Sequence, residues 1–179
     1  MPSSLSAVRS RAKRIKLLLL DVDGTLTDGS IIYDESGQEF KVFNVLDGFG
    51  MAMMRKANLP IVLASGKHSK VVDRRAQELG VREVYQNIFD KVSLLRPLQR
   101  TYGIDVSEVA FVTDDITDLA LMRKVGLAIA VADAQPDVKR RAHFITQHRG
   151  GRGAVREVCE LILKSQGMWQ RLVRSFYET

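Results

Sequence analysis

The sequence predicts an α/β fold in which helices cover both faces of a parallel β-sheet. Apolar strand-like runs alternate with segments of helical periodicity along most of the chain. The runs at 17–20, 61–64 and 109–112 are apolar at nearly every position, as in strands buried on both faces. No repeat, linker or low-complexity tract divides the 179 residues, a length that suits one core. We therefore expect a domain at 16–165, a basic tail or short helix at 1–15 and a tail at 166–179.

The first half of the chain predicts a strand, a hairpin and two helices around a second strand. The run KLLLLD reads as a buried strand, and two β-prone runs around a Gly-containing turn read as a hairpin. A helix ends near Pro60, and an amphipathic helix ends at Gly80. The expected elements are a strand at 16–21, a hairpin at 30–43, a helix at 47–57, a strand at 61–64 and a helix at 68–79.

The second half continues the alternation. Gly103 and Gly126 mark helix ends, and Pro136 suits a first helical position. The expected strands lie at 84–85, 109–112, 127–131 and 144–146. The expected helices lie at 91–102, 117–125, 136–143 and 154–165.

Polar residues follow three of the expected strands, where parallel α/β sheets place their ligands. Asp21 and Asp23 stand two apart after the first strand, and Gly24 lets the chain turn sharply. Two such carboxylates need a cation between them, or one must be protonated. Asp114, Asp115 and Asp118 form a second acidic cluster after another strand. Together they suit a hard cation such as Mg²⁺.

Two further groups suit a phosphate. The Ser65 hydroxyl and the Gly66 N–H can bind a phosphate oxygen. Lys91 begins a helix, an unfavourable place for a cation beside the helix dipole, unless it faces a metal–phosphate centre. Alone, each of these residues is typical of an ordinary turn, strand end or surface. Their order, each at a strand end or helix start, favours one common site.

The charge of +6 is unevenly distributed. Residues 1–16 carry five basic residues and no acid, 17–138 carry 13 basic and 18 acidic, and 139–179 carry nine basic and three acidic. The acidic body would repel phosphates, so nucleic acid is an unlikely partner. The single cysteine, Cys159, excludes an internal disulfide and fits a reducing compartment, so we expect a cytoplasmic protein. No apolar run is long enough to cross a membrane.

The motifs resemble those of the haloacid dehalogenase (HAD) superfamily. DVDGT at 21–25 resembles the first motif, Ser65 the second, Lys91 the third, and Asp114 with Asp118 the fourth. Four longer stretches resemble the 3-deoxy-D-manno-octulosonate 8-phosphate (KDO 8-P) phosphatases of that superfamily. These are 21–29 (DVDGTLTDG), 43–50 (FNVLDGFG), 127–134 (LAIAVADA) and 150–159 (GGRGAVREVC).

The resemblance implies a Rossmann-like HAD domain without a cap and an Mg²⁺-dependent phosphomonoesterase. Asp21 would form an aspartyl-phosphate, and Asp23 would act as acid and base. The metal would be held by the Asp21 carboxylate, the Asp23 carbonyl and Asp114. Asp115 and Asp118 would lie behind these ligands, and Ser65 and Lys91 would hold phosphoryl oxygens.

The resemblance also implies a phosphorylated keto-sugar acid substrate, with KDO 8-P first, in lipopolysaccharide precursor biosynthesis. A homotetramer is implied, in which the hairpin 30–43 and the segment 150–165 complete neighbouring sites. The substrate-binding residues expected are Asp23, Asn44, Asp47, Gly48, Gly66, Lys67, Arg75 and Lys91.

Four positions depart from the family pattern. Leu46, Ala52 and Lys67 stand where the family usually has arginine, which binds carboxylate or phosphate bidentately. Thr113 replaces a glycine before Asp114. Other possibilities stay open: a phosphatase for a nonulosonate 9-phosphate or another small ester, a receiver-like signalling domain, a degenerate homologue that binds without turnover, and a nucleic-acid binder.

Overall fold

The computed structural model describes residues 4–178, and its centre is a six-stranded parallel sheet of order β5-β4-β1-β6-β7-β8. The predicted α/β fold is confirmed. The strands of this sheet are β1 (Leu17–Leu20), β4 (Ile61–Ala64), β5 (Glu83–Tyr85), β6 (Val109–Thr113), β7 (Leu127–Ala130) and β8 (Phe144–Ile145). β1 lies between β4 and β6, in register with Leu18 beside Ile61 and Ala110.

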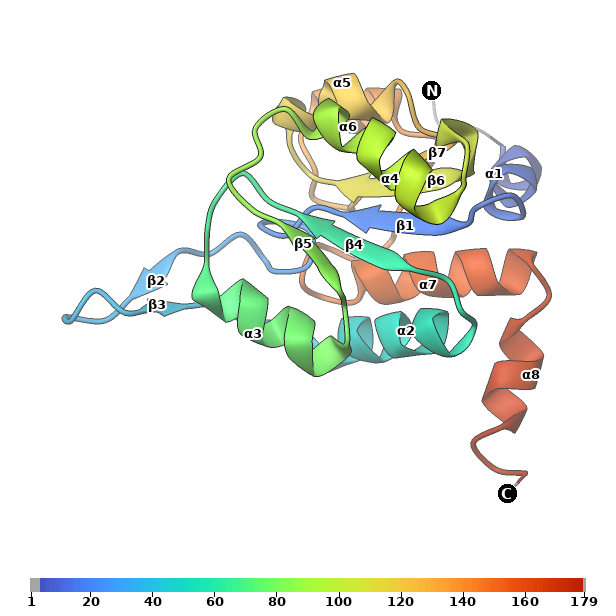
Figure 1. The fold of residues 1–179 in the computed structure, drawn as a ribbon, viewed down its shortest axis with the longest axis horizontal. Coiled ribbons are helices and arrows are strands. Elements are labelled where there is room, and N and C mark those ends of the chain that lie inside the picture. Colours follow the sequence, from blue (N-terminus) through green and yellow to red (C-terminus); the bar gives the residue numbers. More distant parts are fainter. Residues whose placement is uncertain (1–3, 179) are drawn as a thin grey trace.

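Helices cover both faces of the sheet (Figure 1). α2, α3 and α7 lie on one face and α4, α5 and α6 on the other. The helices are α1 (Leu5–Ala12), α2 (Val45–Lys56), α3 (Lys70–Leu79), α4 (Leu95–Tyr102), α5 (Leu119–Met122), α6 (Pro136–Arg141), α7 (Ala154–Ser165) and α8 (Trp169–Arg174). Short 3₁₀ turns η1 (Lys91–Leu94), η2 (Val106–Glu108) and η3 (Ile116–Asp118) precede α4, β6 and α5.

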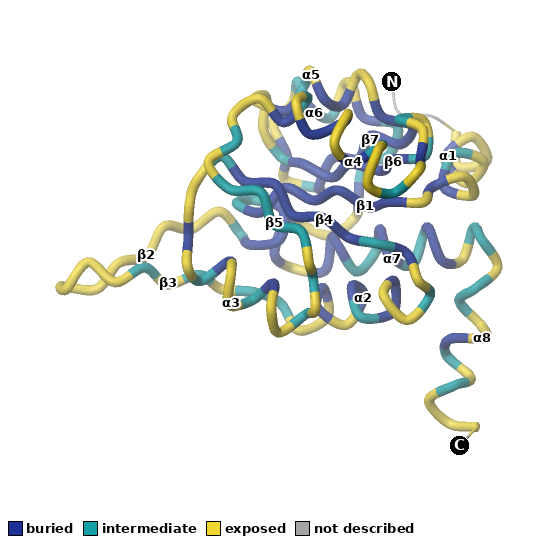
Figure 2. The backbone as a smooth tube through the Cα atoms, in the orientation of Figure 1, coloured by how far each residue is buried: buried dark blue, intermediate teal, exposed yellow. Residues whose placement is uncertain are grey.

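The core follows from the apolar strands. All residues of β1, β4, β6 and β7 are buried, whereas the hairpin is largely exposed (Figure 2). The hairpin, β2 (Ile32–Tyr33) and β3 (Glu39–Phe40), projects from the body between β1 and α2. Within residues 4–178 nothing larger than this hairpin is inserted there, so the fold has no cap domain.

Two of the predicted helices contain 3₁₀ segments. The helix predicted at 117–125 is divided into η3 and α5, and it ends before Gly126, whose added Cβ would lie 1.8 Å from the Ser107 carbonyl oxygen. The helix predicted at 91–102 begins as the 3₁₀ turn η1. Pro97 has no N–H to donate to the carbonyl four residues earlier, so the α-helical hydrogen bonds do not extend into this turn.

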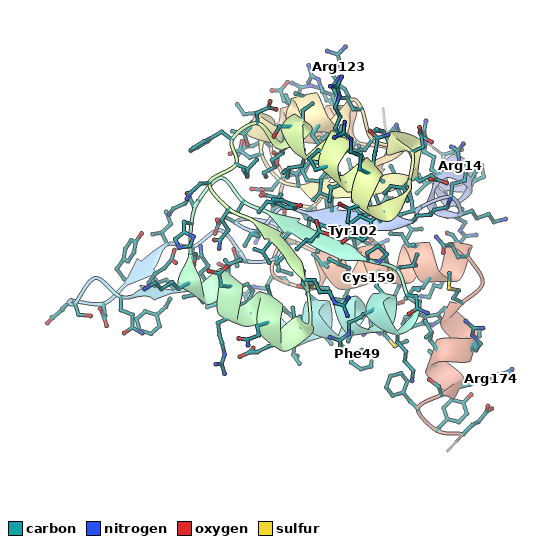
Figure 3. The ribbon with its side chains drawn as sticks, in the orientation of Figure 1. Arg14, Phe49, Tyr102, Arg123, Cys159 and Arg174 are labelled. Carbon is teal, nitrogen blue, oxygen red and sulfur yellow. The ribbon has the colours of Figure 1, made fainter. Side chains whose placement is uncertain are left out.

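Both ends of the chain pack on the body. The segment predicted as a tail or short helix contains α1, which buries Val8 and Ala12. Its residues 1–3 lie outside the described residues. The segment 166–179, expected to be a tail, contains α8, and beyond it Phe176 stacks on Phe49 at 5.5 Å between ring centroids. Figure 3 shows Phe49 on the α2 side of the molecule, toward α8. In the part of the chain that is described, no helix has the length and apolarity needed to span a bilayer.

Candidate active site

The site is built where β1 and β6 end, side by side. Because the two strands are parallel and adjacent, the residues after each of them meet at the same sheet edge. Asp21 follows β1, and its N–H donates to the Val112 carbonyl at 3.0 Å, so the sheet ladder itself fixes this backbone. Asp114 follows β6. The expected acidic pair therefore lies at one edge of a rigid sheet.

A buried lysine links two of the carboxylates. Lys91 Nζ donates to Asp21 Oδ1 at 2.5 Å and to Asp118 Oδ2 at 2.8 Å. Thr113 Oγ1 donates to the same Asp118 oxygen at 2.6 Å. The threonine that departs from the family pattern thus contributes a hydrogen bond as well as bulk. Asp118 holds Lys91 in place.

Asp114 is packed against the turn after β1. A Cβ added at Gly24, which has a positive φ of 81°, would lie 2.1 Å from Asp114 Oδ2, so only glycine fits here. Asp114 Oδ1 and Asp118 Oδ1 are buried and have no hydrogen-bond donor among the described residues. Buried acceptors of this kind require a proton, a water or a cation.

Burial and mutual repulsion change the pKa values of this cluster. Burial raises the pKa of Asp21, the charges of Asp118 and Asp114 raise it further, and Lys91 opposes them. Burial also raises the pKa of Asp114, assisted by Asp115 and Asp118, while a hydrogen bond with the Asp21 carboxyl lowers it. A hydrogen bond between the Asp21 and Asp114 carboxyl groups requires that one of them hold a proton when no cation is bound.

These residues fit Mg²⁺. No group of three acidic, histidine or cysteine side chains within residues 4–178 is placed to hold a metal alone. The expected set is smaller: the Asp21 and Asp114 carboxylates and the Asp23 carbonyl, with remaining positions left for water and phosphate. Mg²⁺ commonly keeps waters or substrate oxygens in this way. The unpartnered Asp114 oxygen beside Asp21 is the observation that supports this donor set.

Asp23 and Ser65 face each other. Ser65 Oγ donates to Asp23 Oδ2 at 3.3 Å, and the Lys67 N–H donates to Ser65 Oγ at 3.1 Å. Gly66 lies beside the ring of Phe89, which is 81% exposed. The structure therefore groups Asp21, Asp23, Ser65, Lys91 and Asp114, with the main chain of 66–67 at the border.

Other expected site residues have different roles. Asp47 is 0% exposed, and its carboxylate accepts hydrogen bonds from the N–H groups of Gly153 (3.1 Å) and Arg156 (2.8 Å). It caps α7 and is not available to a substrate, which corrects the prediction. Asp115 is exposed, and its carboxylate accepts from the N–H of Ile116 at the start of η3.

The remaining expected residues lie around α2 and α3. Asn44 caps α2 by accepting from the Leu46 N–H at 2.8 Å. Gly48 is buried, and a Cβ there would lie 2.5 Å from Arg75 Nη2, so this glycine makes room for the arginine. Arg75 pairs with Glu78 at 3.3 Å and lies over the Phe43 ring. Within residues 4–178, no hydrogen bond or ion pair joins Asn44, Gly48 or Arg75 to the Asp21 cluster.

The segment 150–165 packs against the body of its own chain. The Gly151 N–H donates to the Thr25 carbonyl at 2.9 Å, and a Cβ at Gly150 would lie 1.8 Å from the Gly24 carbonyl oxygen. The glycines allow this loop to lie against the Gly24–Thr27 turn. α7 then buries Cys159 and its other apolar residues against α2 and the sheet (Figure 3).

Sequence reasoning missed Lys41. Its ammonium, with 3% of the side chain exposed, contacts Asp23 Oδ1 and lies 3.3 Å from Glu39 Oε1. Burial opposes its charge, yet Asp23 and Glu39 raise the pKa of Lys41 above the ordinary lysine value. The only sequence feature that pointed to it was a basic residue in the second run of the predicted hairpin. The neighbouring residues did not indicate that its side chain would turn inward.

Comparisons with known proteins agree with this arrangement. The haloacid dehalogenase-like hydrolase family matches residues 76–158. A KDO 8-P phosphatase from Yersinia pestis is 42% identical over 159 residues, 89% of this chain and 85% of the relative. Its counterpart from Salmonella typhi is 43% identical over 160 residues, with the same shares covered.

Solved structures show the same fold. A KDO 8-P phosphatase from Moraxella catarrhalis, crystallised with a magnesium ion, phosphate and KDO, has a TM-score of 0.91 and 40% identity. It covers 94% of this chain and 97% of its own. A probable phosphatase from Pseudomonas syringae has a TM-score of 0.93 and 41% identity, covering 97% and 98% of the two chains.

Proposed function

The chain belongs to the KDO 8-P phosphatase family of the haloacid dehalogenase superfamily, and we propose that it is an Mg²⁺-dependent phosphatase that hydrolyses KDO 8-P to the free sugar acid and phosphate. The observation that carries this proposal is the buried Asp21–Lys91–Asp118 arrangement beside the unpartnered Asp114 oxygen. Similarity also supports the proposal, because the chain is about 40% identical to KDO 8-P phosphatases over most of its own length and most of theirs.

In the proposed reaction, an Asp21 oxygen attacks phosphorus and the bond to the sugar oxygen breaks, leaving an aspartyl-phosphate. Asp23 gives its proton to the departing oxygen. It then takes a proton from water as that water attacks the phosphoryl group, which frees Asp21 and restores Asp23. Lys91 keeps Asp21 in place through its 2.5 Å hydrogen bond and, with the Ser65 hydroxyl, stabilises charge on the phosphoryl oxygens.

Asp21, the Asp23 carbonyl and Asp114 would hold Mg²⁺. When bound, the ion supplies polarisation of a phosphoryl oxygen and neutralises negative charge. The same charge would offset the burial and the repulsion that raise the pKa values of Asp21 and Asp114, and would favour the ionised, nucleophilic form of Asp21.

The choice of sugar acid depends on cations around the site. Leu46 and Lys67 are exposed and Ala52 is half-buried. Of the three, only Lys67 keeps the positive charge of the arginine usual in the family, and it lacks the planar, bidentate geometry of arginine. A nonulosonate 9-phosphate is the alternative substrate, since it presents the same carboxylate and phosphate on a longer chain.

Assembly as a homotetramer is supported by apolar surface on the projecting hairpin. Ile31, Ile32, Tyr33, Phe40 and Val42 are exposed there, and Val45 and Leu46 extend the patch onto the start of α2. Such a contiguous apolar surface is typical of a protein interface. We propose that it packs against neighbouring copies. The buried, unpaired Cys159 is consistent with the proposed cytoplasmic location.

A substrate panel with purified protein tests the function. We expect Mg²⁺-dependent hydrolysis of KDO 8-P, with kcat/KM at least about tenfold above that for nonulosonate 9-phosphates and simple hexose phosphates. Equal rates would refute the substrate assignment. Tight KDO 8-P binding without turnover would instead identify a degenerate homologue. Light scattering of the same sample would show four copies per particle if the assembly is as proposed.

A further inference from the structure

Among the ion-paired basic side chains of residues 4–178 that the proposed reaction leaves without a role, Lys41 is the most enclosed, with 3% of its side chain exposed. It follows β3, on the hairpin that otherwise faces solvent, yet its ammonium contacts Asp23 Oδ1 and is 3.3 Å from Glu39 Oε1. A buried lysine is costly unless it is paired and hydrogen-bonded. Here both its carboxylate partners are present, and one of them is the expected acid and base.

Glu39 is itself held by a second layer of side chains. Ser69 Oγ donates to Glu39 Oε2, and Ser69 is the N-cap residue of α3. A serine at this position usually caps the helix with its hydroxyl, but this one makes no such bond and is directed to Glu39 instead. The structure therefore uses a helix-capping group to fix the partner of Lys41.

The hydrogen bonds continue to two further elements. The Ser69 N–H donates to Gln86 Oε1 at 2.6 Å, and Gln86 Nε2 donates to Asp73 Oδ1 at 2.6 Å. Groups from the hairpin, from α3 with its N-cap and from the loop after β5 thus form one hydrogen-bonded chain that passes through the Ser69 backbone and ends at Asp23. Supports of this kind hold a reacting group in a narrow range of positions.

Asp23 then has a defined orientation in which each oxygen has a donor. Oδ1 contacts Lys41, and Oδ2 accepts from Ser65 at 3.3 Å. Proton transfer to a leaving oxygen needs the carboxyl within hydrogen-bond reach of that oxygen, so its rotation costs rate. Lys91 donates to Asp21, the residue that attacks phosphorus, whereas the contacts of Lys41 are with Asp23 and Glu39. Lys41 is therefore better placed to orient Asp23 than to bind a phosphoryl oxygen.

We propose that Lys41, held by Glu39 and Ser69, is a positioning residue that orients the Asp23 carboxyl for proton transfer to the leaving oxygen. This inference rests on the proposed phosphatase function. It predicts that removing Lys41 lowers kcat/KM for a substrate only to the extent that its leaving group must be protonated. Alkoxide leaving groups need one, whereas p-nitrophenolate leaves readily without it.

The test compares kcat/KM for KDO 8-P and for p-nitrophenyl phosphate, since kcat/KM reports the steps up to formation of the aspartyl-phosphate. For Lys41→Met we expect a loss of about 100-fold with KDO 8-P and less than about fivefold with p-nitrophenyl phosphate. Lys41→Arg, which keeps the charge, should recover most of the loss. Glu39→Gln should show the same pattern at about tenfold, and it provides the answer if Lys41→Met does not fold.

Lys16→Met is the matched control, because Lys16 also pairs with a glutamate, Glu108, at 2.7 Å, but at the other end of β1. It should leave both kcat/KM values unchanged. Equal losses with the two substrates, or no loss, in Lys41→Met and Glu39→Gln would overturn the role of Lys41. Wild-type protein that hydrolyses neither ester would instead overturn the proposed function, and the role of Lys41 with it.

Discussion

Two buried carboxylate sites in this protein are satisfied in different ways. Asp47, at the junction of α2 and α7, receives two backbone N–H groups at the N-terminus of α7. Asp21 and Asp114 meet at the sheet edge, where the ammonium of Lys91 donates to Asp21 and to Asp118, and an Asp114 oxygen has no donor among the described residues. Burial raises the pKa of carboxyls at both sites.

The difference separates a structural acid from a site for a ligand. A helix N-terminus offers fixed N–H groups and a favourable dipole, so Asp47 needs nothing from outside. The sheet edge brings together more negative charge than Lys91 neutralises, so it needs a cation. Burial and acidity alone do not distinguish the two; the donors that face each carboxylate do.

The largest effect should follow from removing the nucleophile. Asp21→Asn keeps the size and the hydrogen-bonding capacity of the side chain but cannot form the aspartyl-phosphate, so kcat should fall by about 10⁴-fold or more. Steady-state assays with KDO 8-P measure this, and circular dichroism checks the fold. Turnover near the wild-type rate would show that Asp21 is not the nucleophile.

The opposite outcome is expected at Asp47. Asp47→Ala leaves the N–H groups of Gly153 and Arg156 without their acceptor, which should cost about 2–3 kcal/mol of unfolding free energy. Because Asp47 does not face the substrate, kcat of the folded protein should change less than about twofold. Urea unfolding together with assays would measure both. A large kcat loss with unchanged stability would restore Asp47 to the active site.

The sequence predicted one of these sites better than the other for a physical reason. Asp21, Ser65 and Asp114 follow apolar strands, and parallel pairing places such residues at one edge whatever the details of packing. The partners of Asp47 lie 106 and 109 residues away in sequence. Only the docking of α7 on α2 makes it a cap, and no local pattern in the sequence records that.

Lys41 illustrates the same limit at shorter range. The hairpin itself was predicted from its two β-prone runs and turn, and β2 and β3 confirm it. The inward turn of Lys41, however, depends on Asp23 and Glu39 meeting it in three dimensions. The sequence shows that Leu46, Ala52 and Lys67 stand where the family usually has arginine. Whether they contact a substrate depends on geometry that residue identity does not give.

Removing one charge from the sheet edge should have a moderate effect on stability. Asp114→Asn lowers the repulsion around Asp21, so the metal-free protein should gain about 1 kcal/mol, or a few degrees in Tm. The same variant should lose the rise in Tm that Mg²⁺ gives the wild type, since it removes a metal ligand. Thermal unfolding with Mg²⁺ or with EDTA measures both. Asp137→Asn, on the exposed face of α6, is the control.

The smallest effect concerns pH. A carboxyl whose pKa is raised on folding binds its proton more tightly in the folded state, so its contribution to stability is greatest below the ordinary value of 3.8 and is lost as pH rises toward the raised value. Metal-free protein should therefore lose stability from this cluster as pH increases. Mg²⁺ competes with those protons, so its stabilising effect should grow by about 1–2 °C in Tm between mildly acidic and mildly alkaline buffer.

Asp114→Asn should show little of this pH dependence, whereas Asp47→Asn should keep it, because Asp47 is satisfied by backbone N–H groups and not by a cation. If the Mg²⁺ effect in wild type were independent of pH, protons and metal would not share the Asp21–Asp114 site, and the distinction between the two buried carboxylate sites would fail.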